Sequence, residues 1–90
     1  MATLAQKWLE EGERRGLQQG LQQGLQQGLL KARREDIVAL LRARLQPDEA
    51  WLQRVAERIA AIDDLDRLQQ LLIVAGQVES PEAFEDALAR

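Results

Sequence analysis

The chain has 90 residues, a formal net charge of −3 at pH 7, and neither cysteine nor histidine. This length permits one small domain, and the lack of cysteine excludes disulfides and thiolate metal sites. Nucleophilic catalysis needs a Ser, Thr or Cys beside a general base, but Thr3 and Ser80 are the only hydroxyl residues and no histidine accompanies them. We therefore expect a non-enzyme with no catalytic, cofactor-binding or metal-binding residue, and no cofactor.

The first predicted element is a helix that begins near the N-terminus. Thr3 followed by Gln6 matches the capping-box pattern, so Thr3 is the predicted N-cap. Leu4 and Trp8 lie four residues apart and share a face, where Trp8 is expected to be a packing anchor. Two ion pairs at the favourable four-residue spacing are also expected, Glu10 with Arg14 and Glu11 with Arg15.

The segment that follows is a tandem repeat. The tetrapeptide Gly-Leu-Gln-Gln occurs three times from Gly16 to Gln27, and the glycine spacing extends to Gly12 and Gly28. On a helix, a spacing of four places the glycines in one stripe and the leucines in a second stripe beside it. Each interior glycine destabilises a helix by about 1 kcal/mol relative to alanine, so the five together oppose it by roughly 5 kcal/mol. A packed partner is needed to offset this.

Small residues four apart let two helix backbones approach closely, which predicts a close-packed helix pair formed by two copies of the chain. Because the period of four exceeds 3.6, the stripes favour a right-handed wrap rather than a left-handed zipper. The alternative is a weakly helical linker. The predicted interface residues are Leu4, Trp8, Gly12, Gly16, Leu17, Gly20, Leu21, Gly24, Leu25, Gly28 and Leu29.

The same helix is expected to continue beyond the repeat. Leu30, Ile37, Val38, Leu41 and Leu45 have the spacing of an apolar helix face, and the next helix breaker is Pro47. A helix over residues 3–45 would be about 60 Å long, which exceeds any core of 90 residues and again indicates a partner chain. A break inside the repeat is the alternative.

Three short helices are predicted after Pro47. The second helix begins with Pro47 in its first turn. The third has Asp63 as N-cap and ends near Gly76. The fourth begins at Ser80 with Pro81 and Glu82. The expected core residues are Trp51, Ile59, Leu68, Leu72 and Phe84, with Leu88 also facing inward.

The sequence therefore predicts an all-α, oligomeric protein. Residues 1–35 form a long helix with the Gly-xxx-Gly and leucine stripes, and residues 36–90 form a compact cap with three short helices. A core this small is marginally stable alone, which is a third argument for oligomerisation.

Charge is unevenly distributed along the chain. Residues 1–45 hold eight basic and five acidic side chains, whereas residues 46–90 hold four basic and ten acidic ones. A contact between the two halves, within or between chains, is therefore expected. A basic cluster could instead contact phosphates, but no aromatic residue is interleaved with it, so nucleic-acid binding is the lesser alternative. The cluster consists of Lys31, Arg33, Arg34, Arg42 and Arg44.

No apolar run approaches the roughly 20 residues that span a bilayer, and the N-terminus has no cleavable signal pattern. We expect no membrane partner and a cytoplasmic, bacterial protein.

The order of these features resembles a known family. The segment from Thr3 to Gly12 leads into glycine-spaced, Gln-rich repeats, and the leucine-rich stretches at 37–45 and 65–72 follow, before residues 80–84. This is similar to the C-terminal tail of bacterial recombination-promoting nucleases, also described as putative transposases (the Rpn family). There, the tail follows a PD-(D/E)XK-type endonuclease domain. The resemblance covers nearly all of this chain, but only the tail of the family protein. A departure is Leu45-Gln46-Pro47, where family tails often have an Arg-Phe-Gly type of turn.

The nuclease chemistry of the family cannot be assigned to this chain. It needs an acidic residue two positions before a lysine on a strand, whereas Ala5 and Leu29 precede Lys7 and Lys31. The resemblance implies that the chain corresponds to an excised tail, a separate gene copy, or a product started internally at Met1. Short products of this kind are described as associating with the long form and restraining it.

The resemblance thus implies a regulatory, antitoxin-like small protein. It would form a homodimer, and would bind and inhibit a full-length nuclease that carries the same tail. The alternatives are a purely structural oligomerisation domain and, as the lesser one, a DNA-binding protein that uses the cluster around Lys31, Arg33 and Arg34.

Overall fold

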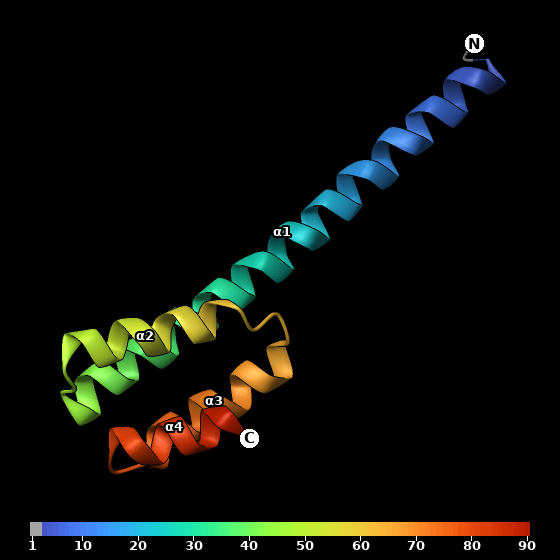
Figure 1. Cartoon of the computed structure of the whole chain (residues 1–90). Coiled ribbons are helices and arrows are strands. Elements are labelled where there is room, and N and C mark those ends of the chain that lie inside the picture. Colours follow the sequence, from blue (N-terminus) through green and yellow to red (C-terminus); the bar gives the residue numbers. More distant parts are fainter. Residues whose placement is uncertain (1–2) are drawn as a thin grey trace.

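The computed structural model describes residues 3–90, and these are almost entirely helical. Its four helices are α1 (Leu4–Leu45), α2 (Glu49–Ala60), α3 (Leu65–Gln77) and α4 (Pro81–Ala89). Figure 1 shows α1 as a long, straight helix whose C-terminal end joins a cluster made with the other three. The described chain measures 67 × 22 × 17 Å. The all-α prediction is confirmed, and Met1, where an internal start is expected, lies outside the described residues.

Helix α1 runs without a break through the glycine repeat, so the predicted continuous helix is confirmed and the alternative of a break is wrong. Its N-terminus has the predicted capping box. The Thr3 hydroxyl accepts a hydrogen bond from the backbone N–H of Gln6 at 3.2 Å, and the Thr3 backbone N–H donates to Gln6 Oε1 at 2.9 Å. These two bonds satisfy backbone groups that the first turn of a helix leaves without partners.

The end of α1 requires an unusual backbone conformation. Gln46, the C-cap, has φ 45° and ψ 53°, and it is the only non-glycine residue with positive φ in the described chain. This left-handed conformation stops the helix and turns the chain toward Pro47. An L-residue adopts it at a conformational cost that glycine does not have.

We expect Gln46→Gly to stabilise the protein by about 0.5–1 kcal/mol, because glycine removes the steric strain at the C-cap. The measurement is thermal unfolding followed by circular dichroism. The matched control is Gln53→Gly, an exposed position inside α2, which should lower the stability by about 1 kcal/mol. A lower midpoint for Gln46→Gly would show that the side chain makes a compensating contribution.

The core lies between the C-terminal part of α1 and the three short helices. Helix α1 packs most extensively against α3, then against α2, while α4 packs on α3. The cap is thus a bundle that includes the end of α1, since the first buried side chain of α1 is Leu30. The buried residues are Leu30, Ile37, Leu41, Trp51, Leu52, Val55, Ile59, Leu68, Leu71, Ala75 and Phe84. Four of the residues predicted to lie in the core are buried, namely Trp51, Ile59, Leu68 and Phe84. Leu72 and Leu88 are half-buried and pack against the core.

Two predicted helix starts are wrong by one or two residues. Helix α2 begins at Glu49 with Asp48 as its N-cap, so Pro47 precedes the helix rather than forming its first turn. The N-cap of α3 is Asp64 and not Asp63. Its carboxylate accepts from the backbone N–H groups of residues 66 and 67. The predicted start of α4 is confirmed, because the Ser80 hydroxyl accepts from the backbone of residue 83 at 3.2 Å.

Three arginines hold the helices together. Each donates hydrogen bonds to backbone carbonyls in, or just after, the last turn of another helix. Arg34 of α1 donates to the carbonyl of Ile62, just after α2, at 2.7 Å. Arg44 of α1 donates to the carbonyls of Ala75 and Val78 at the end of α3, at 2.6 and 2.8 Å. Arg67 of α3 bonds the last turn of α4 at 2.9 Å. The charge-assisted bonds of Arg34 and Arg44 thus fix the ends of α2 and α3 to α1, and that of Arg67 fixes α4 to α3.

Candidate interaction surface

The N-terminal part of α1 lies almost entirely outside the cap, and only its end, at Gln26 and Gln27, lines a pocket together with Asp63–Leu65. Every side chain from Thr3 to Leu29 is exposed. This segment, which we call the free segment of α1, extends away from the cap (Figure 1). At a rise of about 1.5 Å per residue it is roughly 40 Å long. All eleven predicted interface residues lie on it, so the cap covers none of them.

The leucine stripe is exposed to an unusual degree for large apolar side chains. Leu17, Leu21 and Leu25 are 60–69% exposed, and Leu29, nearest the cap, is 46% exposed. Leu4, Trp8 and Leu9 near the N-terminus are similarly exposed. Single exposed apolar residues are ordinary, but a contiguous row of them marks an interaction surface.

The glycine stripe has no function inside the chain's own fold. A Cβ atom added to Gly12, Gly16, Gly20, Gly24 or Gly28 would meet nothing within 4 Å. Gly76, in contrast, lies against the cap, where an added Cβ would approach Leu40 Cδ2 at 3.8 Å. The five stripe glycines therefore destabilise α1 without allowing any close approach within the chain.

The two stripes border a shallow apolar groove along α1. It has a volume of about 450 Å³ and is lined by Gly16, Leu17, Gly20, Leu21, Gly24 and Leu25. The leucines form one side, and the bare backbone at the glycines forms the floor. The structure thus brings together the central six of the predicted interface residues, while Leu4 and Trp8 lie several turns away.

The predicted ion pairs along the free segment are not formed. The ion pairs within residues 3–90 are Arg33–Asp36, Arg34–Asp63 and Arg42–Glu49, at 3.5, 2.8 and 2.6 Å, so Glu10–Arg14 and Glu11–Arg15 are absent. Exposed pairs of this kind contribute little to stability, and the side chains of the free segment remain available to a partner.

Most of the basic cluster is committed to the cap. Arg34 and Arg42 pair with acidic residues of the C-terminal half, which is the predicted contact between the two halves, made within the chain. Arg44 bonds the end of α3, and Arg33 pairs with Asp36 on its own helix. These arginines do not form one free basic surface, which counts against binding of phosphates.

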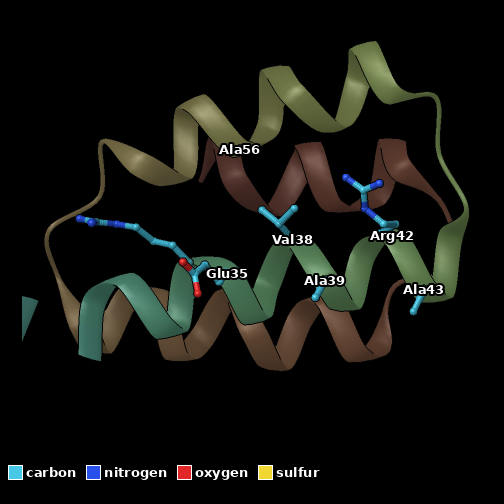
Figure 2. A pocket seen from close by; sticks show the side chains of 7 residues that line it. Glu35, Val38, Ala39, Arg42, Ala43 and Ala56 are labelled. Carbon is cyan, nitrogen blue, oxygen red and sulfur yellow. The ribbon is translucent and has the colours of Figure 1, made fainter. Parts of the chain in front are cut away.

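A second apolar groove lies beside the cap and was not foreseen from the sequence. Val38, Ala39 and Ala43 of α1 and Ala56 of α2 line it, and it has a volume of about 490 Å³. Figure 2 shows Val38 projecting toward α2, with Glu35 and Arg42 at the rim. The alanines carry no periodic signal of their own, because the groove exists only where α2 lies against α1. We call it the cap groove.

Two other features are absent from the described residues. No helix among residues 3–90 has the length and apolar character needed to cross a membrane. In the same range, no three or more His, Cys, Asp or Glu side chains are grouped so that they could hold a metal ion.

Comparison with known proteins identifies no relative: no family model matches the chain, and neither a curated protein nor a solved structure is significantly similar to it. The resemblance to nuclease tails therefore stays a hypothesis based on the sequence pattern alone.

Proposed function

We propose that the chain is a non-catalytic association module, whose free segment of α1 pairs with the same segment of a second copy. The observation that supports this most directly is the row of glycines. The chain's own packing does not need them, yet they oppose the helix by roughly 5 kcal/mol. A second backbone lying in the groove is what such a row accommodates.

The exposed leucines supply the driving force for the pairing. Full burial of one leucine side chain contributes about 1.5–3 kcal/mol. Four leucines, Leu17, Leu21, Leu25 and Leu29, lie beside the glycines and are exposed in the single chain. Their burial in a pair is of the size needed to offset the glycines, so helix formation and association are coupled.

This coupling predicts that the helix content of the protein rises with its concentration. An isolated helix of this length with five glycines is marginal in water, so the free segment should fray when the chain is alone. Circular dichroism at 222 nm, measured from about 1 to 100 µM, should show a growing helical signal. A signal per residue that does not change over this range, in a chain that stays monomeric, would contradict the coupling.

We further propose that the partner includes a longer protein with the same tail, namely a full-length nuclease of the kind that the sequence resembles. The predicted interface residues all lie within residues 3–29, so a longer chain that contains this segment would present the same residues. The small chain would then replace one long subunit in a mixed pair. It would keep two nuclease domains apart and thereby inhibit cleavage, as an antitoxin-like regulator does.

The test of this regulatory role is a titration of DNA cleavage by a nuclease carrying the same tail. Added 90-residue chain should reduce cleavage and saturate near one small chain per long chain. The control is the chain with Gly20→Leu and Gly24→Leu, which should not inhibit. If cleavage is undiminished while the small chain still pairs with itself, the protein is an association module only.

A further inference from the structure

Charged side chains flank the leucine and glycine stripes on one face of α1. Residues spaced by three and four lie on the same side of a helix, and this spacing connects Lys7, Glu10, Arg14, Leu17, Leu21, Gly24, Gly28, Lys31, Glu35 and Val38. All of these except Val38, which is half-buried, are exposed. The face therefore has an apolar centre. Lys7, Glu10 and Arg14 lie on its N-terminal side, and Lys31 and Glu35, in the reverse order of charge to Lys7 and Glu10, lie on its C-terminal side.

The order of these charges distinguishes the two possible orientations of a helix pair. In a symmetric parallel pair each residue lies opposite its own copy, so Lys7, Glu10, Lys31 and Glu35 would each face a like charge. Like charges at close range destabilise a helix pair. In an antiparallel pair centred on Leu21, residues at equal distances before and after Leu21 lie opposite each other. Lys7 and Glu35 are equally far along the chain from Leu21, one before it and one after it, and Glu10 and Lys31 are very nearly so.

The same register fits the apolar centre. Leu17 of one chain lies opposite Gly24 and Leu25 of the other, and Leu21 lies near Leu21 of the second copy. Leucine side chains thus meet the bare backbone of the groove whose volume is about 450 Å³. Arg14, which is on this face too, lies opposite Gly28 and meets no like charge.

The position of the cap groove also fits an antiparallel pair centred on Leu21. Leu4 precedes Leu21 by the same sequence separation by which Val38 follows it. The N-terminal end of one copy therefore reaches the mouth of the cap groove of the other, where Val38, Ala39 and Ala56 leave apolar surface open. Leu4 is 63% exposed in the single chain, and the groove offers apolar surface to cover it. Two-fold symmetry repeats the contact at both ends.

We propose that the second copy binds antiparallel, centred on Leu21, with Lys7 opposite Glu35, Glu10 opposite Lys31, and the N-terminal turn of each copy at the cap groove of the other. This inference rests on the proposed function, because it specifies the orientation of the partner on the same surface. It places the two caps at opposite ends of the pair.

Disulfide trapping tests the orientation, because the chain has no cysteine of its own. Leu21→Cys should form a disulfide-linked dimer, since residue 21 faces its own copy both in a parallel pair and in the antiparallel pair centred on Leu21. Lys7→Cys mixed with Glu35→Cys should give the mixed disulfide as the main product, and neither variant alone should cross-link. This mixed pair keeps its second Lys7–Glu35 contact.

The outcomes separate the inference from the proposed function. Cross-linking of Lys7→Cys with itself and of Glu35→Cys with itself, with no excess of the mixed product, would establish a parallel pair and overturn the inference. If Leu21→Cys does not cross-link although the protein is a dimer in solution, the register centred on Leu21 is wrong and the inference fails. A protein that stays monomeric would overturn the proposed function as well.

Charge reversal gives an independent readout without cysteine. Lys31→Glu places a like charge opposite Glu10 in the antiparallel pair and should weaken the dimer by roughly tenfold. Adding Glu10→Lys to Lys31→Glu restores opposite charges and should recover the original dissociation constant. A parallel pair retains like charges in all three proteins, so equal affinity for the three would overturn the inference.

Discussion

Replacement of Gly20 and Gly24 together by leucine is expected to weaken self-association by about 100-fold or more. The new side chains fill the groove in which the partner's backbone lies, and forcing bulk into a packed contact costs about 1–3 kcal/mol at each position. A symmetric pair contains four such positions. The dissociation constant from sedimentation velocity measures the effect.

The same variant should be more helical as a single chain, because leucine forms helix better than glycine by nearly 1 kcal/mol at each position and meets no clash within the chain. Weaker association together with higher helicity distinguishes lost packing from misfolding. The matched control is Gln22→Leu with Gln26→Leu, which introduces the same two leucine side chains at about 200° around the helix from the glycines. The control should associate as the parent does, and unaltered association of the glycine variant would refute close packing.

Phe84→Ala is expected to unfold the cap. Phe84 is fully buried and is the largest fully buried side chain in the core, and such a truncation costs about 3–5 kcal/mol. A cap core of eleven buried residues supports only a few kcal/mol of stability. Helix α4 contributes no other fully buried residue, so its contact with α3 depends on this side chain. Thermal unfolding by circular dichroism should lack the cooperative transition of the parent.

The matched control for this variant is Ile73→Ala on α3. Ile73 is 61% exposed, so its truncation leaves no cavity and should change the stability by less than about 0.5 kcal/mol. A cooperative transition in Phe84→Ala near the parent midpoint would mean that the cap does not depend on α4.

Local chemistry explains which parts of the fold the sequence predicts well. Thr3 with Gln6 and Ser80 with Pro81 are complete capping patterns, and both helix starts are confirmed. Asp63 and Asp64 are equally suitable caps in isolation. The distinction arises because Arg34 of α1 binds Asp63 at 2.8 Å, and this contact depends on how α1 and the loop before α3 are placed.

The candidate interaction surface could also be predicted from the sequence only in part. The period of four glycines and leucines is explicit in the sequence, so the stripes and the groove between them follow directly from helical geometry. The cap groove depends on α2 lying beside Val38 and Ala39, a tertiary arrangement that alanines do not encode locally. The expected pairs Glu10–Arg14 and Glu11–Arg15 fail because exposed side chains gain too little from pairing to be held in one geometry.

Association of the free segment of α1 with a second copy of itself should make the mass of the protein depend on its concentration. The most direct test is the mass of the protein in solution, measured by sedimentation equilibrium between about 1 and 100 µM. We expect a concentration-dependent shift from 10.2 kDa to twice that mass, with the Gly20→Leu and Gly24→Leu variant staying at the lower value. A parent chain that remains at the single-chain mass throughout this range would show that the free segment does not pair.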